Sequence, residues 1–319
     1  MEVNIMRVSV IMLIYNADYL RIKATLKSIV IQKNIELELI IADDGSNISY
    51  EEEIKKFLSD YANIPFMYLK SKKNMGTVLN FCKGVQKAKG KYVKPISPGD
   101  CFYDADSLKK IVDFMETNYA KVAFGLAAFY FRTDSNNITV VPKNSPELYR
   151  DYDKTKYRQK RIINNLLIYK DNILGAGLCY EKNTLTKYLE IITNRVCYVE
   201  DFVTYFMAVD GIQIYCFSEY MLWYEFGEGV STGVSKEWDY RIWKDREVCF
   251  EILAERERTK IVNTAQLLHK TYVFKNVFLK KLVRILIEPR LIIFKLRKKS
   301  VSKMTVDEVE LNHIRCYYE

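Results

Sequence analysis

The sequence predicts an α/β fold with a mostly parallel central sheet, helices on both faces of the sheet, and a C-terminal helical extension. Short apolar segments alternate with amphipathic segments through the first hundred residues, and the apolar ones end near residues 15, 42, 70 and 96. This spacing of about 27 residues fits one strand and one helix. Repeated units of this kind join parallel neighbours by right-handed crossovers, which cover the sheet with helices.

Four strands are expected from runs of β-branched and aromatic residues. Residues 7–15 are almost continuously apolar, as in a strand that is buried on both faces. Between the strands apolar residues recur every three to four positions, as Ile54, Phe57 and Tyr61 do, which is typical of a helix that buries one face. We assign the strands to residues 7–15, 37–42, 66–70 and 91–96, and the helices between them to segments around 20–30, 54–61 and 78–85.

A change in composition near residue 235 divides the chain into two predicted parts. Residues 1–235 begin with the alternating pattern, whereas residues 236–319 contain basic, amphipathic helical segments. A length of 319 residues fits an enlarged α/β domain with an appendage. We therefore predict an α/β domain at 1–235 and a helical, basic region at 236–319.

The composition excludes several classes of protein. Hydrophobic residues make up 49% and charged residues 28%, which rules out wholesale disorder. Seven scattered cysteines without a C-x-x-C pair argue against a disulfide framework and favour a reducing cytosol. The chain has two histidines, His269 and His313, both late in the sequence, which argues against a Ser-His-Asp triad. No targeting segment or membrane span is evident, so we expect a cytoplasmic protein.

Polar residues follow three of the predicted strands at the point where each strand ends. These are Tyr15-Asn16, Asp43-Asp44 and Asp100. The carboxyl ends of parallel strands share one edge of a sheet, and ligands bind in the crevice at that edge. A single Asp-Gly after a strand is usually only a turn. Three acidic or amide sites on one edge favour a ligand site instead.

The expected ligand follows from what the first strand lacks. No G-x-G-x-x-G follows it, and no G-x-x-x-x-G-K-[ST] occurs in the chain, which argues against a dinucleotide-dependent oxidoreductase and a P-loop enzyme. Asp43 or Asp44 suits hydrogen bonds from a base or a ribose. Asp100 suits Mg²⁺ or Mn²⁺, whose preference for oxygen matches a carboxylate together with phosphate.

Four segments, taken in order, resemble the inverting glycosyltransferases of family 2, which have the Rossmann-like GT-A fold. They are VSVIMLIYNADYL, IADDGSN, NMGTVLNFCKGVQKAKGKYVKPISPGD and YVEDFVTYF. The resemblance covers roughly residues 5–235. It implies a nucleotide-sugar site with Leu13, Tyr15 and Asn16 near the base. Asp44 and Asp43 would contact the base or ribose. The loop of Asn74 and Gly76 and the side chain of Ser97 would complete the site.

The segment Ser97-Pro98-Gly99-Asp100 stands where this family usually has an acidic D-x-D motif. Because Ser97 and Gly99 occupy positions often held by aspartate, the resemblance leaves Asp100 as the metal ligand of this turn, with Glu225 as a second candidate. The cofactor expected is Mn²⁺ or Mg²⁺. Further along, Gly229, Ser231 and Thr232 can form a phosphate-binding loop, although an ordinary polar turn explains them equally well.

The second pair of acids is Glu200-Asp201. Asp201 precedes an apolar run and is expected in the first turn of a helix, where the helix dipole favours the ionised carboxylate. Spacing alone favours a plain helix cap. The resemblance instead assigns Asp201 as the general base, beside Glu200, and it places Gly175-Ala176-Gly177 on the acceptor side, where a simple strand bend is the alternative.

The segment 278–300 mixes apolar residues with many lysines and arginines. Its internal charges exclude a membrane span, but it suits contact with an anionic membrane surface. A helix pair packed on the catalytic domain and a homo-oligomer interface are the alternatives. Nucleic acid is not expected, because no recognition motif accompanies the basic residues.

The function expected from the resemblance is the transfer of a sugar, with inversion, from a nucleotide-sugar donor to a glycan or a lipid-linked glycan. A UDP-sugar is the expected donor. The expected location is the cytoplasm, with peripheral contact at the inner face of the cell membrane. The alternative is a non-catalytic subunit of glycan assembly that keeps the fold. A sugar-phosphate nucleotidyltransferase is a weaker rival, because Asn16-Ala17-Asp18 lacks the Gly-rich basic loop expected after the first strand.

Overall fold

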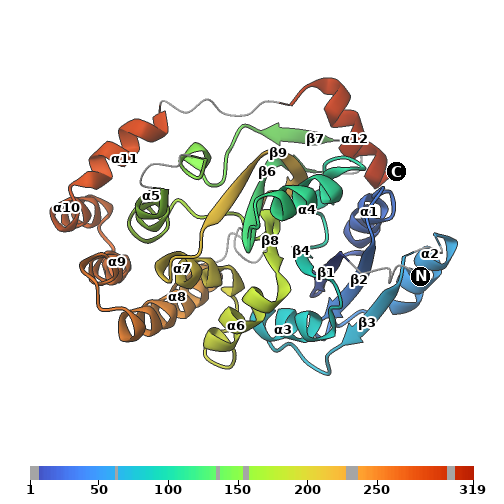
Figure 1. The fold of residues 1–319 in the computed structure, drawn as a ribbon, viewed down its shortest axis with the longest axis horizontal. Coiled ribbons are helices and arrows are strands. Elements are labelled where there is room, and N and C mark those ends of the chain that lie inside the picture. The colour runs from blue at the N-terminus through green and yellow to red at the C-terminus, as the bar shows by residue number, and fades with distance from the viewer. Residues whose placement is uncertain (1–6, 62–63, 134–136, 154–157, 228–235, 300–305) are drawn as a thin grey trace.

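The computed structural model describes residues 7–61, 64–133, 137–153, 158–227, 236–299 and 306–319 (Figure 1). A nine-stranded sheet runs through the molecule in the order β3-β2-β1-β4-β8-β6-β9-β5, and β7 pairs with β6 at its side. The strands are β1 (Val8–Ile14), β2 (Leu37–Asp43), β3 (Phe66–Lys70), β4 (Tyr92–Ile96), β5 (Cys101–Phe102), β6 (Val122–Arg132), β7 (Ile138–Val141), β8 (Leu178–Glu181) and β9 (Ile214–Glu225).

The first half of the sheet confirms the four strands predicted from the sequence. Strands β1 to β4 all run parallel, with Val8 opposite Leu37 in β2 and opposite Tyr92 in β4. Every residue of β2 is buried, and β1 is buried at six of its seven positions. Their continuous apolar runs reflect this burial on both faces.

The second half of the sheet mixes directions. Strand β8 is antiparallel to both β4 and β6, whereas β9 is parallel to β6. The register of β6 and β9 shifts twice, at Gly125/Leu126 and at Leu126/Ala127. These irregularities bend the pair, and β9 ends at Glu225 on the same side of the sheet as the ends of β1 and β4.

Helices cover both faces of the sheet. On one face α1, α2 and α4 bury Ile22, Ile54 and Ile111 against the strands, and on the other face α3 and α6 bury Phe81 and Leu185. The helices through residue 209 are α1 (Tyr19–Val30), α2 (Glu51–Asp60), α3 (Thr77–Lys87), α4 (Ser107–Thr117), α5 (Arg158–Ile163), α6 (Lys182–Ile192) and α7 (Val203–Val209). The predicted α/β layering is therefore confirmed.

The remaining helices form the expected C-terminal extension: α8 (Lys236–Arg256), α9 (Lys260–Lys270), α10 (Val277–Ile287), α11 (Arg290–Lys299) and α12 (Glu308–Tyr318). Figure 1 shows α8 to α11 at one end of the molecule and α12 beside α1 at the other. Phe250 of α8 and Val262 of α9 share a core with α3 and α6, and Tyr318 of α12 packs into a core with Tyr130. The helical region thus shares its core with the sheet, and the division at residue 235 stays a prediction.

No helix within the described ranges combines the length and the apolar character that crossing a membrane requires.

Candidate active site

A cavity of about 340 Å³ opens where β1, β2 and β4 end, as the polar residues after these strands predicted. Asp44 and Asp100 both line it, and so does the distant pair Glu200 and Asp201. Four sequence segments therefore meet at one cavity. Of the sequence-predicted site residues, those on the cavity wall are Leu13, Tyr15, Asn16, Asp44, Ser97, Asp100, Glu200, Asp201 and Glu225.

The two acids that follow β2 have different surroundings. Asp44 accepts hydrogen bonds from the backbone N–H groups of Met75 and Gly76, at 2.9 and 2.8 Å, and still lines the cavity. Burial nevertheless raises the pKa of Asp44. Asp43 is buried away from the cavity wall, because it accepts hydrogen bonds from the backbone N–H of Ser46 and the hydroxyl of Tyr68. Asp43 thus stabilises the turn after β2 and does not line the cavity, and its contact with a nucleotide stays a prediction.

The loop containing Asn74 and Gly76 stands behind Asp44 and does not line the cavity. The amide oxygen of Asn74 accepts a hydrogen bond from the Gly76 N–H at 3.0 Å. Gly76 has a φ of +90°, and a Cβ on it would lie 2.7 Å from the carbonyl oxygen of Cys197. This loop positions Asp44 and brings the start of α3 against the segment that precedes Glu200 and Asp201.

The turn from Ser97 to Asp100 is hydrogen-bonded to Thr25 of α1. The hydroxyl of Thr25 accepts a hydrogen bond from the Gly99 N–H at 3.0 Å and donates to the Asp100 carbonyl at 2.8 Å. Burial raises the pKa of the Asp100 carboxyl to about 8, and the ammonium of Lys94 counteracts this only in part. Lys94 is fully buried in β4 and also donates to the carbonyl of Ala176.

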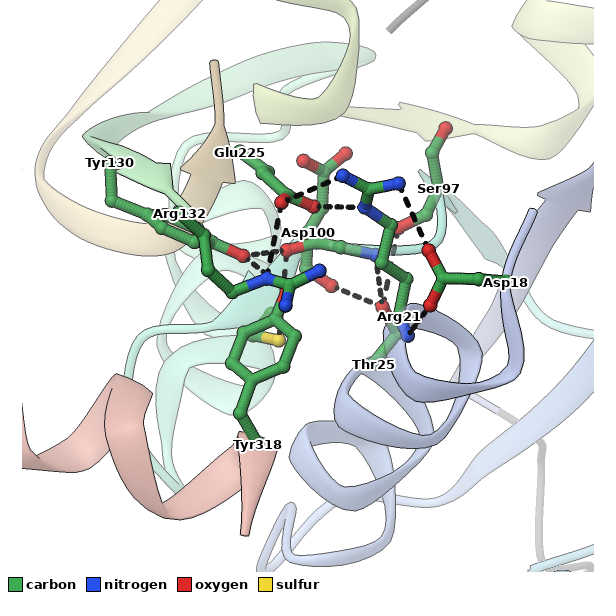
Figure 2. Close-up of polar contacts among 11 residues, drawn as sticks. Asp18, Arg21, Thr25, Ser97, Asp100, Tyr130, Arg132, Glu225 and Tyr318 are labelled. Atoms are coloured by element: carbon green, nitrogen blue, oxygen red, sulfur yellow. Dashed lines mark hydrogen bonds and ion pairs between the residues drawn. The ribbon is translucent and has the colours of Figure 1, made fainter. Parts of the chain in front are cut away.

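Glu225, at the end of β9, lies between two arginines beside this turn (Figure 2). The Nε and NH2 groups of Arg21 donate to its two carboxylate oxygens at 2.8 and 3.2 Å, and Arg132 Nε approaches one of them at 3.4 Å. Arg21 also pairs with Asp18 at 2.9 Å. Only 3% of Glu225 is exposed, so this is a buried ion-pair network.

The two candidate metal ligands at this corner differ in their surroundings. Among the described residues, no group of three or more His, Cys, Asp or Glu side chains is arranged to hold a cation. Both oxygens of Glu225 already accept hydrogen bonds from guanidinium groups. At Gly99 a Cβ would lie 2.2 Å from Glu225 Oε2. Asp100 lines the cavity, and its role as a ligand of Mn²⁺ or Mg²⁺ stays a prediction.

The pair Glu200 and Asp201 also lines the cavity. Both residues lie in a short 3₁₀ turn, Glu200–Phe202, that leads into α7, and neither side chain caps the helix by a hydrogen bond. Burial raises the pKa of both carboxyls, and the negative charge of Asp201 raises the pKa of Glu200 further. The guanidinium of Arg246 acts in the opposite direction on both carboxyls.

The sequence matches the model of one known protein family. The sequence model described as Glycosyl transferase family 2 matches residues 9–171, just over half of the chain. The chain belongs to glycosyl transferase family 2. The resemblance expected from the sequence is therefore confirmed, together with the GT-A-like fold.

Two uncharacterized glycosyltransferases illustrate how far the family relationship extends. The chain is 32% identical to MG025 of Mycoplasma genitalium over 95 residues, which is 29% of this chain and 31% of that protein. It is 26% identical to MJ1057 of Methanocaldococcus jannaschii over 168 residues, or 52% of this chain and 57% of that protein. The similarity thus spans only about a third to a little over half of these relatives.

Two solved structures share the fold at low sequence identity. S. aureus TarS 1-349 in complex with UDP-GlcNAc matches with a TM-score of 0.58 and 15% identity, covering 98% of this chain and 88% of that one. The mannosyltransferase PcManGT of Pyrobaculum calidifontis, in complex with GDP-Man and Mn²⁺, matches with a TM-score of 0.58 and 12% identity, covering 98% and 84%. The GT-A architecture therefore extends over almost the whole chain.

In this family 2 protein, Gly175 lies against the acid pair. A Cβ on Gly175 would be 3.7 Å from the Cβ of Asp201 and 3.8 Å from Glu200 Oε1. Lys94 holds the neighbouring Ala176 through its carbonyl. The Gly175–Gly177 segment is therefore a 3₁₀ turn against the acids, and not merely a bend in a strand. Gly229, Ser231 and Thr232 lie outside the described residues.

Sequence reasoning missed two arginines on the cavity wall, Arg21 and Arg246. Neither is among the site residues predicted from the sequence. For Arg21 the sequence held a signal: it lies in the first turn of α1, where the helix dipole disfavours a positive charge. For Arg246 no local signal exists, because α8 reaches the cavity only through tertiary packing.

Proposed function

We propose that this protein transfers a sugar from a nucleotide-sugar donor, a UDP-sugar by preference, to a hydroxyl of a glycan or lipid-linked glycan, with inversion at the anomeric carbon. The observation that carries the proposal is that Asp44 and the Ser97–Asp100 turn line the same cavity as Glu200 and Asp201. One end of this cavity suits a nucleotide and the other offers a basic carboxylate. Membership of family 2 supports the same chemistry.

In the proposed reaction the acceptor hydroxyl oxygen attacks the anomeric carbon from the face opposite the diphosphate. The bond between that carbon and the diphosphate oxygen breaks, and the nucleoside diphosphate leaves. Asp201 accepts the proton of the attacking hydroxyl, as a carboxylate with a raised pKa is suited to do.

The donor assignment follows the nucleotide seen in the neighbours. TarS is described in complex with UDP and with UDP-GlcNAc, whereas PcManGT is described with GDP-Man. We favour uridine, with Leu13 and Tyr15 against the base and Asp44 near the ribose. A thermal-shift panel of nucleotide sugars and free nucleotides tests this choice. We expect UDP and one UDP-sugar to raise the melting temperature; stabilisation by GDP derivatives alone would reassign the donor.

A non-catalytic role would leave the same fold without turnover. The proposal favours an enzyme, because Asp201 and Arg246 line the same cavity as Asp44 and the Ser97–Asp100 turn. Release of UDP from a bound UDP-sugar, measured with and without added glycan acceptors, separates the two roles. A protein that binds the donor but never releases the nucleotide would be a binding subunit.

We also propose that α10 and α11 contact an anionic membrane surface. No side chain of α10 is buried, and Phe278 and Leu286 are 77% and 72% exposed. Ile292, Ile293 and Leu296 of α11 are exposed as well. Lysines lie among these apolar residues, and each basic residue near an anionic leaflet contributes about 1 kcal/mol. Such contact would bring the cavity close to a lipid-linked acceptor.

Cosedimentation with vesicles tests this surface in the full chain. Truncation is unsuitable, because α12 buries Tyr318 against Tyr130. We expect wild type to bind vesicles that contain an anionic lipid, less tightly at high salt, and Phe278→Ser/Leu286→Ser to lose most of that binding. Tyr119→Ser is the matched control, since Tyr119 is 92% exposed on another helix end. Equal binding by both variants, or binding that salt does not weaken, would contradict the membrane role.

A further inference from the structure

Three positively charged side chains gather around the end of α9, and we call them the basic cluster. They are those of Lys170, Lys280 and Arg284. Arg284 donates a hydrogen bond to the carbonyl of Leu268 at 3.3 Å. The neighbouring His269 donates from Nε2 to a backbone carbonyl of α8 at 3.0 Å, so its Nδ1 accepts from the ammonium of Lys170 at 3.4 Å. Two members of the cluster thus contact consecutive residues of α9.

No acid balances the charge of the basic cluster. In the part of the chain that the structure describes, none of its three side chains forms an ion pair. Burial, together with the charges of the other two members and of Arg246, lowers the pKa of Lys170 to about 7. Cations near the last carbonyls of a helix are favourable, but Arg284 is the member that donates to one of them. Like charges repel, so the cluster as a whole is unfavourable unless an anion binds to it.

Helix α10 has its charged and apolar sides exchanged relative to an ordinary surface helix. Lys280 and Arg284 lie four residues apart, on the side that faces the protein, and both are partly buried. The ammonium of Lys280 lies 4.9 Å from the centre of the Tyr272 ring. Phe278 and Leu286 are exposed on the other side of the helix. Because a surface helix normally buries its apolar side, this exchange fits a ligand with an anionic group and an apolar chain.

Arg246 of α8 connects the basic cluster with the cavity. It lines the cavity wall, and its positive charge lowers the pKa of both Asp201 and Lys170. Trp243, one turn earlier in α8, stacks on His269 with ring centroids 5.4 Å apart, which fixes α8 against α9 (Figure 1). The basic cluster therefore lies beside the end of the cavity where, in the proposed reaction, the acceptor hydroxyl loses its proton.

We propose that Lys170, Lys280 and Arg284 bind the phosphate of a lipid-linked acceptor, whose apolar chain lies against the exposed side of α10. This inference rests on the proposed function and names the chemistry of its acceptor, a phosphate ester carried by a lipid. Ammonium and guanidinium groups bind phosphate oxygens by charge-assisted hydrogen bonds. The exposed apolar side of α10 favours a phosphate on a lipid over one on a soluble glycan. The phosphate stays intact in the reaction, since the cluster only positions the acceptor.

Calorimetric titration of the full chain with dihexanoyl phosphatidic acid, kept below its micelle concentration, tests the proposal. We expect this lipid to bind about tenfold or more tightly than dihexanoylglycerol, which lacks the phosphate, and than inorganic phosphate, which lacks the chain. Arg284→Gln and Lys170→Gln should each weaken its binding about tenfold, because each removes a charge-assisted hydrogen bond. Lys170→Arg should retain the binding. Lys281→Gln is the matched control: it removes one charge from an exposed neighbour in α10 and should keep wild-type affinity.

The rise in melting temperature with UDP shows that each variant is folded and reports separately on the proposed function. Equal affinity of Arg284→Gln, Lys170→Gln and Lys281→Gln for the lipid would overturn the inference and leave the basic cluster with a structural role at the end of α9. Inorganic phosphate that binds as tightly as the lipid would overturn the lipid assignment. If UDP stabilises the wild type and the lipid does not bind, the inference fails while the proposed function stands. Absence of stabilisation by UDP and by every nucleotide sugar would instead count against the proposed function.

Discussion

Two pairs of acids face the same cavity and differ in how their charge is balanced. Asp100 and Glu225 lie beside Arg21, Arg132 and the buried Lys94, whereas Glu200 and Asp201 have Arg246 as their nearby cation. At the first pair the cations are bonded directly to Glu225, which makes a fixed charged wall. At the second pair burial dominates, and the carboxyls have raised pKa values.

The same type of residue, a carboxylate, serves different tasks depending on the groups that surround it. A carboxylate bound by two guanidinium groups is a poor base, because its lone pairs are engaged. A carboxylate that is buried with a second acid holds a proton more readily, which a base needs during sugar transfer. Glu225 is therefore unsuited to proton transfer, whereas Glu200 and Asp201 are suited to it.

The largest expected effect separates these two tasks. Asp201→Asn removes the base while it keeps the shape, so we expect the turnover number to fall by about two orders of magnitude or more. UDP affinity should change less than about twofold, since the proposed role of Asp201 is in proton transfer and not in nucleotide binding. Steady-state rates of UDP release and calorimetric UDP binding measure the two quantities. Unchanged turnover would assign Asp201 a purely structural role.

The next prediction concerns a steric clash that displaces the Glu225 carboxylate. Gly99→Ala places a Cβ 2.2 Å from Glu225 Oε2 at a residue with a φ of +96°. We expect a loss of about 2–3 kcal/mol in the free energy of unfolding, because left-handed strain and displacement of Glu225 add together. Chemical denaturation of the variant checks this. Gly175→Ala is the control, since its Cβ would meet its nearest neighbour at an ordinary 3.7 Å, and it should cost far less.

A third prediction concerns pH. The base must be deprotonated to act, so the rate should fall as the pH drops through the raised pKa of the Glu200–Asp201 pair. Arg246 lowers the pKa of Asp201, and Arg246→Gln should therefore move this acidic limb to higher pH, while Arg246→Lys should move it less. The pH dependence of kcat/KM measures the limb. A shift to lower pH would show that Arg246 does not act on the base.

The smallest expected effect concerns the hydrogen bonds that link α12 to the Ser97–Asp100 turn. Tyr318 of α12 shares a hydrogen bond of 2.7 Å with the hydroxyl of Tyr130, which in turn donates to the Gly99 carbonyl. Tyr318→Phe should lower the free energy of unfolding by about 1 kcal/mol through the loss of one buried hydrogen bond. Thermal unfolding measures it, with Tyr119→Phe on the surface as a control that should have no effect.

Much of the parallel half of the molecule could be predicted from the sequence. Strands β1 to β4 are buried on both faces, so their apolar runs are strong signals, and they end within about one residue of the predicted ends at 15, 42, 70 and 96. The residues that follow them, from Asn16 to Asp100, then meet at one edge because the strands are parallel. That Asp43 stabilises the turn after β2 could not be predicted, because a turn residue and a ligand look alike in sequence.

The other half could not be predicted in the same way. Arg132, Glu225 and Arg246 reach the site through β6, β9 and α8, whose positions depend on long-range pairing and on helix packing. Nothing near Glu225 in the sequence indicates that its partner is Arg21, more than 200 positions away. Ion pairs between distant segments leave no periodic trace, so the charge balance of the site became visible only in three dimensions.

A crystal structure of the Asp201→Asn variant with a bound UDP-sugar tests the central claim most directly. The account predicts uracil at the Leu13–Asp44 end and the anomeric carbon facing residue 201 from the side opposite the diphosphate. A donor bound outside this cavity, or one whose leaving group lies on the same face of the sugar as residue 201, would contradict it.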